Sequence, residues 1–86
     1  MDVKELKILK DGLSEYYGSI GAIKEATKKL KPGGYSKVYI HEVLRGARNN
    51  VKVLDIASKV LLKLKQEAAS MEATIGNRMQ EIKSIA

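Results

Sequence analysis

Hydrophobic residues recur every three or four positions through most of the chain, which is the spacing of one face of an α-helix. Asp2 is suited to cap the first such run, because its carboxylate can accept hydrogen bonds from the N–H groups of a first helical turn. The run continues until Gly18 interrupts it. We therefore predict a first helix over residues 3–17.

Two shorter helices are predicted next. Ser19 can cap the first of them, over residues 20–30, and the sequence KPGG at 31–34 ends it, since Pro disfavours helix at the preceding residue and Gly reverses the chain. Ser36 can cap a third helix that runs to Arg45. This arrangement places a glycine-containing turn between two short helices.

The last predicted helix is much longer. Asn49 and Asn50 provide its start, and the chain that follows has no Pro and only Gly76 as a poor helix former. The helix is predicted over residues 51–84. An alternative is that it breaks at Gly76 and folds back on itself as a hairpin within the monomer.

One hydrophobic register of this helix holds for nearly five heptads, and nine of its ten positions are apolar, Arg78 being the exception. A seven-residue repeat keeps one seam of a helix facing a partner helix, so the pattern predicts a coiled coil. Glu67 and Glu72 would oppose each other across a parallel pair, which leaves the orientation open. The residues predicted to form an oligomer, with a homodimer favoured, are Leu61, Leu64, Ala68, Met71, Ile75, Ile82 and Ile85.

The first turns of this helix are apolar on two sides, because Val53, Ile56 and Val60 fall off the seam. We expect these residues to close a core over the three shorter helices. The predicted fold is all-α, with a helix-turn-helix head of three to four helices over residues 1–60. A C-terminal helical oligomerisation extension follows over residues 61–86.

Composition agrees with a helical protein and limits its chemistry. Phe, Trp and Cys are absent, so no disulfide or thiolate metal site is available, and a reducing compartment is compatible with the chain. The first residues are charged and lack the apolar segment of a signal peptide or membrane span. We therefore expect a soluble, cytoplasmic protein with no membrane partner, no metal, no cofactor and no small-molecule substrate.

Positive charge concentrates in the middle of the chain. The formal net charge is +6, and residues 24–52 contain eight Lys or Arg against two Glu, so this segment alone accounts for +6. Such concentration predicts a polyanionic partner. The alternative is a lysine-rich surface that is simply solvated.

The second and third predicted helices have the pattern of a helix-turn-helix, with buried residues Ile40 and Val43 three apart on the second of them. Lys37, His41 and Arg45 would then lie in one exposed row, since they are spaced by four residues. The residues predicted to face the bases of duplex DNA are Lys37, Val38, His41, Glu42 and Arg45.

The chemistry of this row fits base recognition. Lys37 and Arg45 can donate to guanine O6 and N7, and Val38 can contact a thymine methyl group. Plainer roles stay open, with Val38 in the core and Arg45 interacting only with its own helix end. Ser36 can bind phosphate or act only as a cap. The residues predicted to contact the DNA backbone are Ser36, Lys28, Lys29, Lys31, Arg48, Asn49 and Lys52.

Three segments of the chain resemble the small lambda-repressor-like DNA-binding proteins of phages and mobile elements: GSIGAI at 18–23, GYSKVYI at 34–40 and VLRGARNN at 43–50. The resemblance covers about residues 18–60 and implies sequence-specific operator binding, usually as a dimer. Two departures stand out, an apparent insertion of six residues at 28–33 and the long helical tail. The residues that the resemblance places against DNA are Ser36, Lys37, His41, Glu42 and Arg45.

An enzyme is not expected, because the single histidine, His41, has no Cys partner, and adjacent residues of a helix such as His41 and Glu42 point about 100° apart. RNA binding stays open, since Tyr35 and Tyr39 could stack on unpaired bases. A helical protein-interaction module, for example a phage packaging or assembly component, is a further alternative. We predict a transcriptional regulator, acting as a repressor by occupying an operator, with half-sites about one helical turn apart.

Overall fold

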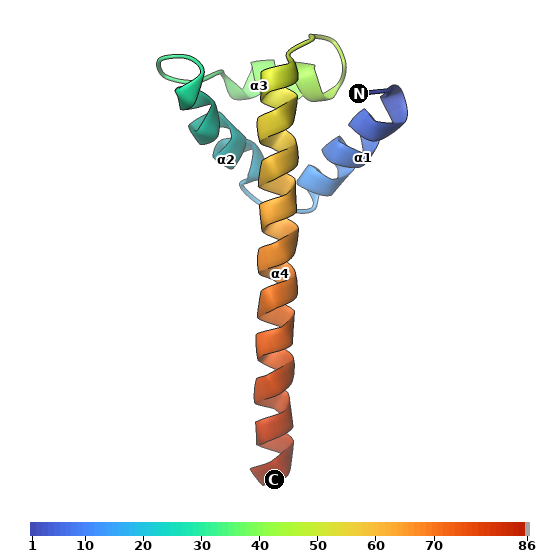
Figure 1. Cartoon of the computed structure of the whole chain (residues 1–86), viewed down its shortest axis with the longest axis vertical. Helices are drawn as coiled ribbons and strands as arrows, with labels where there is room; N and C mark the ends of the chain where they lie inside the picture. Colours follow the sequence, from blue (N-terminus) through green and yellow to red (C-terminus); the bar gives the residue numbers. More distant parts are fainter. Residues whose placement is uncertain (86) are drawn as a thin grey trace.

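A computed structural model describes residues 1–85, and this part of the protein is all-helical (Figure 1). The helices α1 (Val3–Ser14), α2 (Ser19–Ala26) and α3 (Lys37–Leu44) pack around the first turns of α4 (Val51–Ile85) to form a head. The short 3-10 turn η1 (Thr27–Lys29) follows α2 directly. The rest of α4 extends from the head as a stalk, so the molecule measures 55 × 30 × 16 Å. The predicted all-α fold with a long C-terminal helix is confirmed.

Three helices begin at the cap that their sequence predicts. The side chains of Asp2, Ser36 and Asn50 each accept a hydrogen bond from the backbone N–H three residues on, at 2.8, 3.1 and 3.2 Å. Each bond satisfies a donor that the first turn of a helix leaves without an intrahelical partner. The starts of α1, α3 and α4 are therefore encoded locally.

The start of α2 differs from the prediction, because Ser19 is not its cap. Gly18 precedes the helix with a φ of 78° and supplies no side-chain hydrogen bond. Ser19 is buried, and its hydroxyl donates to the carbonyl oxygen of Leu13 at 2.7 Å. This bond ties the start of α2 to the end of α1, which ends at Ser14 rather than at residue 17.

The end of α2 is also earlier than predicted, at Ala26 instead of residue 30. Thr27 is fully buried, its hydroxyl donates to the carbonyl oxygen of Lys24 at 2.6 Å, and it accepts from the N–H of Tyr35 at 3.0 Å. Through these two hydrogen bonds, Thr27 connects the end of α2 to Tyr35, which follows the glycine turn. The six residues that look like an insertion therefore lengthen the connection between α2 and α3 and leave the helix short.

Hydrophobic side chains from all four helices form one core, and α4 contributes Val53, Ala57 and Leu61 to it. Ile56 and Val60 pack against this core from the side, as expected. The core also contains Leu9, Leu13, Ile23, Ile40, Val43 and Leu44.

Leu61 belongs to the head and corrects two predictions. Its side chain is 9% exposed and lies directly over Gly12 of α1, where a Cβ would come within 2.8 Å of it. It is therefore a core residue, whereas we predicted it in an oligomer seam. The head therefore includes a residue beyond the predicted boundary at 60. Of the predicted extension, residue 86 lies outside the described residues.

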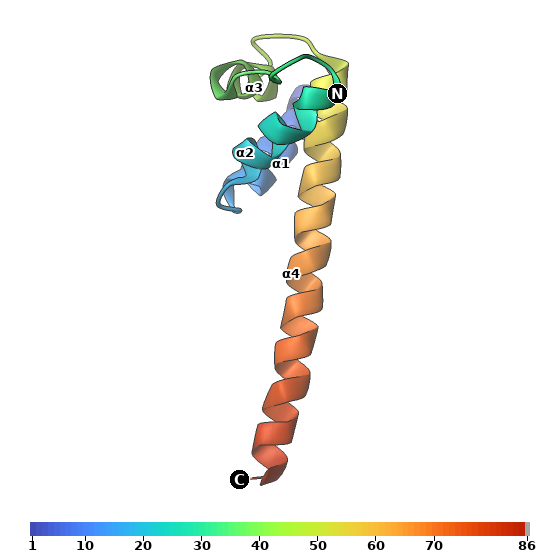
Figure 2. The same cartoon turned by 90° about the vertical axis from the view of Figure 1, so that its left-hand side faces the viewer.

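The stalk is a single unbroken helix. α4 continues through Gly76 to Ile85 with no change of direction (Figure 2). A Cβ at Gly76 would have no other atom within 4 Å, so this glycine faces open space. The alternative of a hairpin at Gly76 is therefore wrong for this structure.

Replacing Gly34 with alanine is expected to destabilise the head more than the same change at Gly33. Both residues have left-handed φ values, 74° and 79°, which disfavour a side chain by about 1 kcal/mol or more. A Cβ at Gly34 would also meet the carbonyl oxygen of Lys24 at 2.8 Å, whereas one at Gly33 would meet nothing within 4 Å. We expect urea unfolding to give losses of about 2 and about 1 kcal/mol. Equal losses would show that the turn relaxes around the added methyl group.

Candidate nucleic-acid interface

α3 lies across the N-terminal end of α4 (Figures 1 and 2), and one face of α3 is buried while the other is exposed. Ile40, Val43 and Leu44 point inward, since they are at most 2% exposed. Because these residues are three and four positions apart, they occupy one side of the helix. The predicted recognition helix is thus held by its inner side, and its outer side is open to a partner.

The outer side of α3 contains the row that the sequence predicted. Lys37, His41 and Arg45 are all exposed, and Val38 beside them is 69% exposed. Arg45 follows the last residue of α3, and its N–H still bonds to the carbonyl oxygen of His41 at 3.0 Å. Four of the five predicted base-contacting residues therefore share one free surface, and Val38 is not a core residue.

The fifth residue, Glu42, is engaged elsewhere. Its carboxylate accepts a hydrogen bond from Nε of Arg48, a residue that we predicted to contact the DNA backbone. The hydrogen bond and the charge of Glu42 raise the pKa of Arg48 above its ordinary value. The pair reduces the net positive charge at Arg48, whose side chain is 58% exposed.

A column of four stacked side chains connects the basic loops on either side of α3. The rings of Tyr35 and Tyr39 stack at 4.6 Å between centroids. The ammonium of Lys31 covers the ring of Tyr35 at 5.2 Å, and the guanidinium of Arg48 covers that of Tyr39 at 5.5 Å. Asn50 also donates to Tyr39 Oη at 3.1 Å. The column fixes both loops relative to α3, because each such contact contributes about 0.5–1 kcal/mol.

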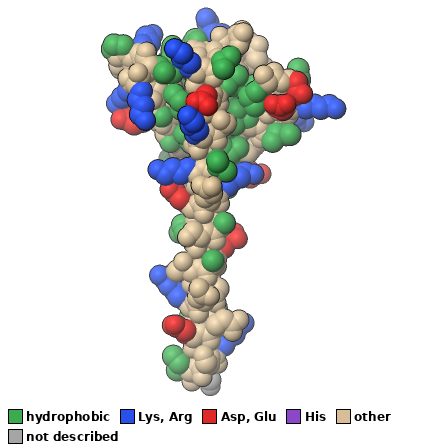
Figure 3. All heavy atoms as spheres, in the orientation of Figure 1, with side chains coloured by type: hydrophobic (Ala, Val, Ile, Leu, Met, Phe, Trp, Pro, Cys, Tyr) green, Lys and Arg blue, Asp and Glu red, His purple; other side chains and the backbone are tan. Residues whose placement is uncertain are grey.

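The remaining predicted backbone contacts are on the surface of the head. Lys28 pairs with Glu25 at 2.9 Å, but both side chains are more than half exposed, so the pair contributes little stability. Ser36 is exposed as well as being a helix cap. In Figure 3, Lys and Arg side chains are more crowded over the head than along the stalk. The other exposed residues of the predicted set are Lys29, Lys31, Asn49 and Lys52.

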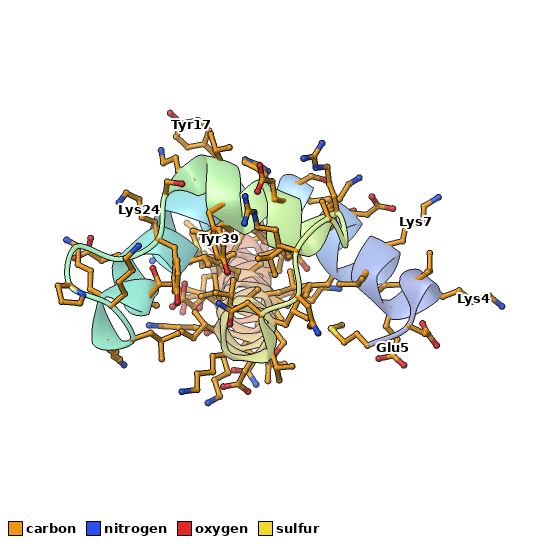
Figure 4. All side chains as sticks on the ribbon, turned by 90° about the horizontal axis from the view of Figure 1, so that it is seen from above. Lys4, Glu5, Lys7, Tyr17, Lys24 and Tyr39 are labelled. Atoms are coloured by element: carbon orange, nitrogen blue, oxygen red, sulfur yellow. The ribbon has the colours of Figure 1, made fainter. Side chains whose placement is uncertain are left out.

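Tyr17 is a candidate nucleic-acid contact that we did not predict from the sequence. It is fully exposed, and with Lys37 and His41 it lines a shallow cleft of about 400 Å³ between the α1–α2 turn and α3. Figure 4 looks along α4 and shows Tyr17 projecting on the side of the head away from that helix. The signal in the sequence is an aromatic residue directly before Gly18, where a helix has ended and no core position remains.

The chain matches no family model, no curated protein and no solved structure, so its function must be inferred from its own residues and their geometry. Within residues 1–85, no helix is both long enough and apolar enough to cross a membrane.

Proposed function

We propose that the protein binds duplex DNA in a sequence-specific manner, with α3 in the major groove. The observation that carries this proposal is the exposed row of Lys37, His41 and Arg45 on a short helix whose opposite side is buried. The major groove of B-DNA is about 12 Å wide and admits one α-helix. Lys and Arg on such a helix can donate to guanine, and Val38 can contact a thymine methyl group.

Positive charge at both ends of α3 supports the proposal. Lys29 and Lys31 precede the helix, and Lys52 follows it at the start of α4, all three exposed. Phosphate contacts from such residues position a recognition helix without reading the sequence. Ser36 adds a hydroxyl and the free N–H groups of a helix N-terminus.

The contacts of Tyr35 and Tyr39 favour duplex DNA over single-stranded RNA as the ligand of α3. Tyr35 and Tyr39 stack on each other, and Lys31 and Arg48 cover their outer faces. Unpaired bases would need these faces for stacking. In this head, other side chains of the protein already cover these ring faces.

We propose further that the protein regulates transcription in the cytoplasm of its host as a repressor, by occupying an operator. This part of the proposal is supported by the resemblance to lambda-repressor-like proteins of phages and mobile elements. A pure protein-interaction module would have no need of the exposed basic row on α3.

The proposal is tested by selecting binding sites from a random duplex pool at near-physiological salt. We expect the wild-type protein to enrich one motif and the variant Lys37→Ala/Arg45→Ala to recover none. Lys65→Ala/Arg78→Ala is the matched control, because it removes the same charge from the stalk and should recover the wild-type motif. No enrichment by the wild-type protein would exclude sequence-specific DNA binding.

A further inference from the structure

One face of the stalk is apolar and uncovered. Its large side chains, Met71, Ile75, Met79 and Ile82, are 65, 52, 44 and 56% exposed. Together with Ala68 they follow one another at spacings of three, four, four and three residues, which keeps them on one side of a straight helix. We call these five residues the stalk stripe.

The stalk stripe differs from the strict heptad that the sequence suggested. That register placed Arg78 and Ile85 in the seam, whereas the observed stripe passes through Met79, which is 44% exposed, and reaches Ile82 by a step of three residues. Two successive steps of four residues interrupt a heptad and reduce its supercoil. The stripe therefore suits contact with a nearly straight helix.

Most of the stalk has no packing partner within the chain. Every described residue from Ala69 onward is exposed, so this part of α4 has no core of its own. Most of the stability of a helix in a protein comes from packing of its apolar face, and Gly76 disfavours helix by about 1 kcal/mol. An apolar stripe on such a helix gains stability when a second helix covers it.

The stripe lies on the same side of α4 as the head. Ala57, Leu61, Leu64 and Ala68 follow one another at spacings of four, three and four, so the face that packs against the head continues into the stripe. Figure 2 shows the head on one side of α4, with the stalk bare below it. A helix that covers the stripe and continues towards the head therefore meets α1 and α2.

This geometry excludes a parallel pair of identical chains with straight stalks. In a parallel pair, residues 51–64 of the second α4 would lie beside the same residues of the first, in the volume that the first head occupies. An antiparallel pair avoids the clash. The α4 helix of the second copy then extends past the C-terminal end of the first stalk, and the head of the second copy lies beyond that end.

We propose that the stalk stripe is a homodimer interface and that it pairs antiparallel with the stripe of a second copy. The spacing is symmetric about Ile75, as a two-fold antiparallel pair requires. Ile75 then opposes Ile75 of the second copy, Met71 opposes Met79, and Ala68 opposes Ile82. Gly76 beside the centre has no Cβ to hold the helices apart.

Either orientation of the two stalks brings two glutamates together, so charge does not favour one of them. The parallel orientation is excluded by the position of the head. A parallel pair would oppose Glu67 to Glu72 of the second copy. An antiparallel pair would oppose Glu67 to Glu81, because it brings flanking positions of the same kind together.

The arrangement has a consequence for DNA that rests on the proposed function. With a rise of 1.5 Å per residue, Val51 lies about 36 Å from Ile75, so the starts of the two α4 helices are about 70 Å apart. The two-fold axis is perpendicular to the plane of the two stalks, and each head lies in that plane, so the exposed faces of the two α3 helices point in opposite directions. Such a dimer would join two DNA segments, and half-sites one helical turn apart do not fit it.

The interface is tested by sedimentation of Ile75→Lys, with Leu62→Lys as the control. Leu62 is 58% exposed on the opposite side of α4, close to the 52% of Ile75. We expect Ile75→Lys to raise the dissociation constant of the dimer by about 100-fold or more and Leu62→Lys to leave it unchanged. A wild-type monomer at high concentration, or an unchanged dimer in Ile75→Lys, would overturn the proposal.

Orientation is tested by disulfide formation, which is clean because the chain contains no Cys. Met71→Cys and Met79→Cys are prepared separately, mixed, and equilibrated in a glutathione redox buffer. An antiparallel pair forms the mixed 71–79 disulfide, since the two Cα atoms must come within about 7 Å. A parallel pair forms 71–71 and 79–79 disulfides, which would refute the orientation. Neither test contains DNA, so each outcome is independent of the proposed function.

Discussion

Replacing Thr27 with valine is expected to lower the free energy of unfolding of the head by about 3 kcal/mol. The side chain is fully buried, and valine keeps its shape but removes the hydroxyl that donates to Lys24 and accepts from Tyr35. A buried donor left without a partner destabilises a protein by about 1–3 kcal/mol, and here an acceptor loses its partner as well. The melting temperature should fall by about 15 °C.

Tyrosine fluorescence during urea unfolding is the measurement, because all four tyrosines, at positions 16, 17, 35 and 39, are in the head and report nothing of the stalk. Thr27→Ser is the control, since it keeps the hydroxyl and loses only a methyl group. We expect it to lose about 1 kcal/mol. If the valine variant is as stable as the serine variant, the two hydrogen bonds do not hold the α2–α3 connection.

Local sequence signals predicted much of this fold. The caps at Asp2, Ser36 and Asn50 hold because a side-chain acceptor and the N–H that it binds are only three residues apart. The hydrophobic period likewise predicts α4, since a face repeated over many turns needs no knowledge of distant contacts. Such features depend on near neighbours in the chain.

The wrong predictions concern features that depend on contacts between residues far apart in the chain. Ser19 has the residue type of a cap, but its hydroxyl bonds to Leu13, six residues back, and Thr27 bonds to Tyr35, eight residues on. These contacts form only when the helices have packed together. The apolar pattern alone therefore extended α2 to residue 30 and placed Leu61 in an outer seam.

The same distinction applies to the candidate site. The row from Lys37 to Arg45 follows from helical spacing, and it is exposed as predicted. The pairing of Glu42 with Arg48 depends on how the chain turns between α3 and α4, which no spacing rule gives. The exposure of Tyr17 depends on where α1 ends, and that end was predicted three residues too late.

Affinity for duplex DNA is expected to fall steeply as salt rises. Among residues 1–85, the side chains of Lys28 and Arg48 are paired with carboxylates, whereas five predicted DNA contacts form no ion pair: Lys29, Lys31, Lys37, Arg45 and Lys52. If the three predicted backbone contacts among them, Lys29, Lys31 and Lys52, contact phosphate, the slope of log K against log salt is about −2.7. Raising salt from about 50 to about 200 mM then weakens binding by about 40-fold.

The contribution of the loop between α2 and α3 can be separated from that of the recognition row. Lys29→Ala/Lys31→Ala removes two phosphate contacts and should reduce the slope by about 1.8 on every DNA sequence. The preferred motif should not change, because phosphate contacts carry no direct sequence information. Lys65→Ala/Lys83→Ala removes equal charge from the stalk and should keep the wild-type slope. A wild-type slope near zero would mean that the basic residues of the head do not contact phosphate, and that their charge serves solvation only.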